Sequence, residues 1–329
     1  MLPMRRWPSI RSRIVPAENR ISGTRSKALP AGFSQTVRGL AIFAIWLSSL
    51  LLFWPSLKAA LGLALHDDRY LQIVLAPLMS SFLIFWQRTD IFSQARYSPR
   101  AGIPLLSVAM LLGLASVSHQ TDGESAGLLF AIFAIVLIWM AGFVLCYGVQ
   151  SFWAALYPLC CLFLMLPLPP SWMDRINTVF QYGSAEVSYQ LLRLSGIPVL
   201  RHGVQFSLPG LNFEIAPECS GIRSSLALVM VAIVAGYVYL RSPWARSALI
   251  FLTVPIVVLK NAVRIAVITA LGAYVDRAFV DGPFHHQYGG LLFSLLGVAL
   301  FVLALATLQK VERRRLALKL WRFLCSART

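Results

Sequence analysis

Apolar runs separated by short polar segments organise this chain of 329 residues. Eight such runs can be followed, each close to the length that an α-helix needs to cross about 30 Å of hydrocarbon. They cover residues 39–57, 71–87, 101–118, 127–147, 150–168, 221–240, 247–273 and 287–308. The pattern predicts an all-α fold: a polytopic bundle of about eight transmembrane helices within 39–308, flanked by tails at 1–38 and 309–329.

The longest polar interruption, 169–219, has an organisation of its own. Between Trp172 and Leu194 the apolar positions recur at helical spacing, which predicts an amphipathic helix at a membrane surface. Segment 197–216 then alternates proline, glycine and apolar residues, which predicts a short hairpin or a covered loop. The bundle is therefore expected to carry a helix-and-loop insertion on one face.

The charge distribution predicts how the bundle lies in the membrane. The chain is 58% hydrophobic and only 13% charged, outside the range of soluble proteins, yet its net charge is +16. Most lysines and arginines flank the runs on the side of the N-terminus, where only Glu18, Asp90 and Glu312 are acidic. The positive-inside rule then predicts that both basic tails are cytoplasmic and that the insertion lies outside. No basic stripe with interleaved aromatics is present, which argues against a nucleic-acid partner.

One of the five cysteines stands apart from the others. Cys219 lies in Pro-Glu-Cys-Ser-Gly-Ile-Arg (217–223), where the polar insertion gives way to the sixth apolar run. The start of a helix lowers the pKa of a thiol and its free N–H groups can hold an oxyanion, so Cys219 is a predicted nucleophile. The remaining cysteines fall in apolar runs or in the basic C-terminal tail: Cys146, Cys160, Cys161 and Cys325. Their spacing predicts neither a metal site nor a cofactor.

Two other polar groups recur at the same predicted depth. Arg264 lies about 17 residues into the seventh run, which places it roughly 26 Å from the inner surface and close to the outer one. A charge there marks a functional residue by default, and a guanidinium can stabilise an oxyanion. His285 and His286 precede the eighth run, and an imidazole can deprotonate a thiol and protonate an amine. The three segments predict a Cys–Arg–His site at the outer surface.

Three further residues are candidates beside that site. Asn261 shares a helix face with Arg264, Arg223 lies one turn into the sixth run, and Ser220 adjoins the cysteine. Asn261 could orient Arg264 or bind a substrate backbone, and Arg223 could bind a carboxylate or the oxyanion. Simpler interpretations stay open: Arg264 could reach the headgroups or form a structural ion pair, and interfacial histidines are often surface residues.

In these residues the chain resembles the exosortase/archaeosortase family of multi-pass membrane cysteine transpeptidases. The resemblance covers about 60–308 and is carried by Asp68-x-Tyr70, Met165-Leu-Pro-Leu-Pro169, Gly196-Ile-Pro198, Leu208-Pro-Gly210, Cys219-Ser-Gly-Ile-Arg223-Ser, Asn261-x-x-Arg264-Ile and His285-x-x-x-Gly289-x-x-x-Phe293. It implies that Cys219 is the nucleophile, Arg264 the oxyanion stabiliser and His285 the general acid and base. The adjacent His286 leaves the choice of histidine open.

The resemblance also implies a substrate and a place of action. Such enzymes act on exported proteins that end in a short motif such as Pro-Glu-Pro, one transmembrane helix and a basic cluster. Cleavage is expected at the outer face of a prokaryotic inner membrane, followed by transfer to a cell-surface acceptor that the sequence does not name. The alternative is a transporter, or a scaffold for exopolysaccharide assembly or export. A transporter predicts broken helices in paired positions, which the sequence lacks, and a scaffold would tolerate Cys219→Ala.

Overall fold

Helices dominate the computed structural model, which describes residues 31–93, 95–118, 124–209, 211–216, 221–277, 279 and 289–326. They are α1 (Ala31–Leu52), α2 (Trp54–His66), α3 (Gln72–Trp86), α4 (Arg88–Ile91), α5 (Pro99–Ser118), α6 (Glu124–Ala154), α7 (Leu156–Cys160), α8 (Pro170–Leu194), α9 (Ile222–Tyr239), α10 (Pro243–Tyr274) and α12 (Gly289–Ser326). The described residues also form two short 3₁₀ helices, η2 (Asp68–Tyr70) and η4 (Cys161–Met165).

The described helices confirm an all-α polytopic membrane protein. Five are long and apolar enough to cross a membrane: 68–86, 99–116, 126–154, 243–274 and 290–318. Two further segments pass this test only as bent pairs, α1 with α2 at 80° and 156–165 with α8 at 100°, and Ser224–Tyr239 is a shorter apolar helix. The predicted runs therefore correspond to helices, although not all of them are single, straight spans.

The fifth predicted run, 150–168, is the clearest departure from one continuous helix. α6 continues through Gly148, whose φ of 87° and ψ of 169° break the helical geometry, and only the short α7 and η4 follow. A side chain at Gly148 would place its Cβ 2.3 Å from the carbonyl oxygen of Arg96, so the kink and the close approach both need glycine. Pro158, Pro167 and Pro169 then keep this stretch from forming one long helix.

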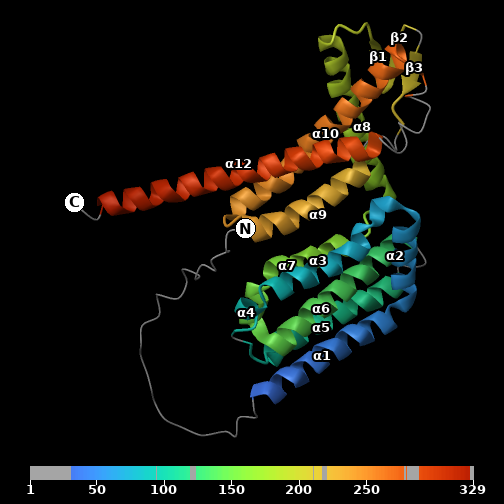
Figure 1. Ribbon diagram of the computed structural model, residues 1–329. Coiled ribbons are helices and arrows are strands. Elements are labelled where there is room, and N and C mark those ends of the chain that lie inside the picture. The colour runs from blue at the N-terminus through green and yellow to red at the C-terminus, as the bar shows by residue number, and fades with distance from the viewer. Residues whose placement is uncertain are drawn as a thin grey trace, which may run out of the picture.

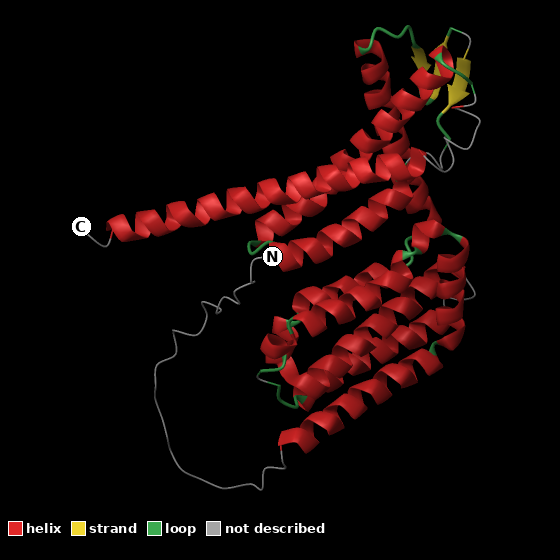
Figure 2. Ribbon diagram, viewed as in Figure 1, coloured by secondary structure: helices red, strands yellow, loops and turns green. Residues whose placement is uncertain are grey.

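Two groups of helices lie side by side, and α9 is the helix of the second group that faces the first (Figure 1). In the first group α6 packs against α1 and α5, and α3 packs against η4; in the second, α10 packs against α8, α9 and α12. α9 contacts α3 and η2 and so joins the two groups. The start of α1 and the end of α12 lie on the same side, whereas α8 and a small sheet extend from the opposite side (Figure 2).

The start of α9 is held by segments that are far apart in the sequence. Tyr70 donates a hydrogen bond from its hydroxyl to the carbonyl of Leu168, at 3.1 Å. The same tyrosine belongs to a buried cluster that includes Met165, Met173 and Ile222. Three of the motif segments noted above, around Tyr70, Leu168 and Ile222, therefore meet at one end of the bundle.

The insertion has the predicted amphipathic helix and a small sheet. α8 ends at Leu194, and two residues later Gly196 has a left-handed φ of 74°. The N–H groups of Gly196 and Ile197 donate to the carbonyls of Arg193 and Leu192 at 3.0 and 3.1 Å. The predicted hairpin is confirmed and carries one more strand: β1 (Leu200–His202), β2 (Gln205–Leu208) and β3 (Leu211–Glu214) form an antiparallel sheet in that order. Its buried side chains pack against α8 and α10.

Candidate functional site

The structure describes some of the predicted site residues and not others. Cys219, Ser220, His285 and His286 lie outside the described residues. Arg223 belongs to the first turn of α9, but its side chain is likewise not described. Arg264 and Asn261 lie on α10 and are described fully, as are the segments that lead into and out of residues 217–220.

Asn261 fixes α10 against α8. It is only 1% exposed, and its side-chain amide donates to the hydroxyl of Ser184 at 3.1 Å. Ser188, one turn further along α8, donates to the carbonyl of Ser184 at 2.6 Å and lies 3.2 Å from the carbonyl oxygen of Ala262. Small residues allow helices in a membrane to approach closely, and polar bonds between them hold the register. The α8–α10 contact is therefore held by buried hydrogen bonds close to Arg264 in the sequence.

Gly221 brings the start of α9 onto the same face of α10. Its φ of 86° is left-handed, and it occupies the N-cap of α9. A Cβ added here would lie 3.3 Å from Val257 and 3.6 Å from the amide carbon of Asn261, so the backbone lies close to α10, and the left-handed φ favours glycine. Arg264, one helical turn beyond Asn261, is half-buried. Gly221, Asn261 and Arg264 thus lie where the start of α9 meets α10, a region called the α9–α10 junction below.

The segment that precedes residues 217–220 is fixed as well. Ile215 is buried, and its carbonyl accepts a hydrogen bond of 2.5 Å from the side-chain amide of Gln181 on α8. Its own N–H donates to the carbonyl of Val204 at 3.0 Å. The chain therefore enters the motif from a point held by α8 and leaves it at Gly221, a point held by α10.

Lys260 is a member of the α9–α10 junction that the sequence analysis did not single out. It is buried, and its ammonium donates to the hydroxyl of Ser224 at 2.7 Å; that hydroxyl in turn donates to the carbonyl of Gly221 at 2.9 Å. α12 covers its aliphatic chain, because a Cβ on Gly297 would lie 2.9 Å from the Cδ of Lys260. In the described part of the chain, no carboxylate pairs with Lys260. Its position could have been noticed in the sequence, because a lysine that interrupts an apolar run marks a functional residue.

One comparison with known proteins found a match. The family described as transmembrane exosortase matches residues 64–302, which is well over half of the chain and contains every segment of the α9–α10 junction. The chain belongs to the exosortase family. No curated protein and no solved structure matches it. Membership supports a membrane protein-sorting role, and the family is in general one of transpeptidases or cysteine proteases.

For an exosortase, the described residues provide a site that favours negative charge. The first turn of α9 directs backbone N–H groups and the positive end of its dipole to its start, and Lys260 and Arg264 add two cations on the neighbouring helix. Such groups stabilise a charge that develops on a reacting oxygen. Within the described ranges, no three histidine, cysteine or acidic side chains are close enough together to hold a metal ion.

Replacing Lys260 with methionine is expected to separate function from stability in this exosortase. Methionine fills a similar volume without a buried charge, and replacing buried ionic groups by apolar ones is often neutral or stabilising. The variant should therefore melt no lower than the wild type in detergent, while cleavage of a sorting signal falls because the link to Ser224 and Gly221 is lost. Lys310→Met, at an exposed position of α12, is the control. A clearly lower Tm, with cleavage reduced only in proportion to folded protein, would make Lys260 a purely structural residue.

Proposed function

We propose that this exosortase is a membrane cysteine transpeptidase that cleaves the C-terminal sorting signal of exported proteins and transfers them to a cell-surface acceptor. The observation that carries the proposal is the packing of Gly221 on Asn261, one turn from Arg264. Chain connectivity adds a limit: two residues span at most about 7 Å, so the Cα of Cys219 stays within that distance of Gly221. The family match supports the same chemistry.

The proposed reaction begins at the sulfur of Cys219. Its thiolate attacks the scissile carbonyl carbon, and the resulting oxyanion is stabilised by Arg264 and by backbone N–H groups at the start of α9. His285, or the adjacent His286, donates a proton to the leaving amine as the peptide C–N bond breaks. The thioester that remains is attacked by an acceptor amine or by water, which forms the new acyl bond and releases the thiol. Asn261 orients Arg264, Arg223 binds a substrate carboxylate, and Ser220 leaves the backbone accessible.

The proposed orientation has both termini in the cytoplasm and the reaction at the outer face of a prokaryotic inner membrane. Its support is the side on which the basic segments lie: α4, the start of α5 and the loop between α9 and α10 share the side of the start of α1 and the end of α12 (Figure 1). Lysines and arginines favour the cytoplasmic side. In this proposal 39–308 is the catalytic domain, 1–38 and 309–329 are cytoplasmic tails, and α12 continues as a helix through the latter to Ser326.

Co-expression with a tailed protein tests the proposal. The substrate is an exported protein that ends in a short motif, one transmembrane helix and a basic cluster, and its C-terminus is determined by mass with and without the exosortase. We expect loss of the tail only when both the exosortase and the complete signal are present. A matched substrate without the motif, but with the helix and cluster, should stay intact. Tail removal that does not depend on the exosortase, or that ignores the motif, would contradict the proposal.

A further inference from the structure

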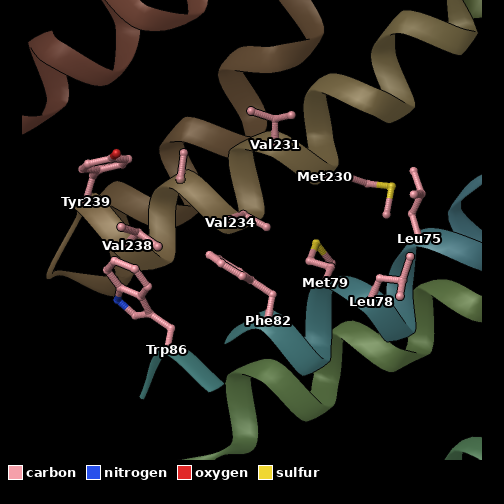
Figure 3. A pocket seen from close by; sticks show the side chains of 11 residues that line it. Leu75, Leu78, Met79, Phe82, Trp86, Met230, Val231, Val234, Val238 and Tyr239 are labelled. Atoms are coloured by element: carbon pink, nitrogen blue, oxygen red, sulfur yellow. The ribbon is translucent and has the colours of Figure 1, made fainter. Parts of the chain in front are cut away.

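An apolar groove opens between α3 and α9, away from the candidate site. Its volume is about 490 Å³, and its walls include Leu75, Phe82 and Trp86 from α3 and Met230, Val234 and Tyr239 from α9 (Figure 3). Trp86 and Tyr239 are 50% and 51% exposed, so the groove is open along one side. Because α3 and α9 are the helices through which the two groups pack, the groove follows the seam between those groups.

The length of the groove corresponds to one leaflet of a bilayer. Leu75 and Trp86 are eleven residues apart on α3, or roughly 16 Å at 1.5 Å per residue. The hydrocarbon core is about 30 Å thick, so the groove covers about half of it. Ile222 and Tyr70 lie in the buried cluster beyond one end, and a 2.5 Å hydrogen bond from the Tyr237 hydroxyl to Gln87 joins the helices at the other. A transmembrane helix of about 20 residues is twice as long as this groove.

The residues at its second end are those of a membrane–water interface. Trp86 and Tyr239 mark that end, and tryptophan and tyrosine are enriched at the level of the headgroups (Figure 3). Arg88 follows directly, with its guanidinium 4.2 Å from the ring centre of Phe85, and Arg241 follows Tyr239 by two residues. Both arginines are exposed. An apolar groove that ends in two aromatic and two cationic side chains has the shape and charge to hold one lipid chain below an anionic headgroup.

Near this end of the groove, three arginines outnumber two carboxylates. Glu312 of α12 directs its carboxylate at the backbone N–H groups of Arg241 and Ser242, at 2.5–3.2 Å. Asp90 on α4 is exposed. Arg246 of α10 donates to the carbonyl of Leu240 at 3.1 Å and adds a third cation beside the first two. Basic residues near a membrane surface attract anionic lipids.

We propose that the α3–α9 groove binds one acyl chain of an anionic phospholipid, with the headgroup phosphate at Arg88 and Arg241. The lipid belongs to the leaflet on the side where α3 and α9 end. It covers the apolar seam between the two groups of helices and holds their relative position. This site is independent of the proposed transpeptidase reaction, which takes place at the opposite ends of the same helices.

Native mass spectrometry of the full-length, delipidated protein tests the site. Phosphatidylglycerol and phosphatidylcholine with identical acyl chains are titrated separately, and we expect one phosphatidylglycerol to bind more tightly than any phosphatidylcholine. Val234→Trp fills the groove and should abolish that binding. In the Arg88→Ala/Arg241→Ala double variant, phosphatidylglycerol should bind about 25-fold more weakly, since each basic residue at a membrane surface contributes about 1 kcal/mol. Leu111→Trp, at a 65% exposed position of α5, and Arg100→Ala are the matched controls and should bind as the wild type does.

Several results would overturn the proposal. Equal affinity for the two lipids would show that Arg88 and Arg241 do not bind the headgroup. Equal effects of Arg100→Ala and of the double variant would show the same. If the folded Val234→Trp variant still binds the lipid, the groove is not the binding site. A dimer that Val234→Trp dissociates would assign the groove to a second copy, and displacement of the lipid by a substrate's membrane helix at equal concentration would assign it to that helix. The double variant changes two exposed residues, so the result stands even if Val234→Trp fails to fold.

Discussion

An Arg264→Ala exosortase is expected to fold and to cleave a sorting signal about 10²–10³-fold more slowly, the range found when one oxyanion donor is removed. The loss should appear in kcat rather than in KM, because the guanidinium is proposed to bind the charge that develops only during attack. Arg264→Lys should recover part of the rate, since it keeps the charge but not the planar pair of donors. Initial rates of tail release at several substrate concentrations provide the measurement.

Arg193→Ala is the matched control for this prediction. Arg193 lies near the end of α8, on the side of the bundle from which the insertion extends, and its side chain is exposed. Its replacement should leave kcat and KM close to those of the wild type. If Arg264→Ala raises KM with no change in kcat, the arginine binds substrate rather than the oxyanion. If its rate equals that of Arg193→Ala, Arg264 has no role in the reaction, and an ion pair or headgroup contact is its function.

The helices of this exosortase could be predicted because each carries its own periodicity. Runs of apolar residues gave the membrane helices, and the spacing from Trp172 to Leu194 predicted α8. The break at Gly148 was harder, because it depends on the approach of the Arg96 carbonyl from a segment about fifty residues earlier. The third strand was missed for a similar reason: β3 forms only by pairing with β2, and four residues are too few for a clear alternation.

The candidate site was predictable in its residue types and less so in its contacts. The shared face of Arg264 and Asn261 follows from helical geometry, and α10 is helical at both positions. The depth of Arg264 in the membrane stays a prediction. The bonds from Asn261 to Ser184 and from Lys260 to Ser224 join residues 77 and 36 positions apart, which no local pattern encodes. The roles of Cys219, His285 and His286 stay predictions, because these residues lie outside the described ranges.

The central claim is that the sulfur of Cys219 performs the reaction, and the mass of a co-expressed substrate tests it most directly. The wild type should remove the C-terminal tail, and Cys219→Ala should leave it in place because the proposed acyl intermediate forms on that sulfur. Cys160→Ala, which removes an exposed thiol on α7, should process the substrate as the wild type does. Equal tail removal by the wild type and Cys219→Ala would contradict the account and return the transporter and scaffold alternatives to consideration.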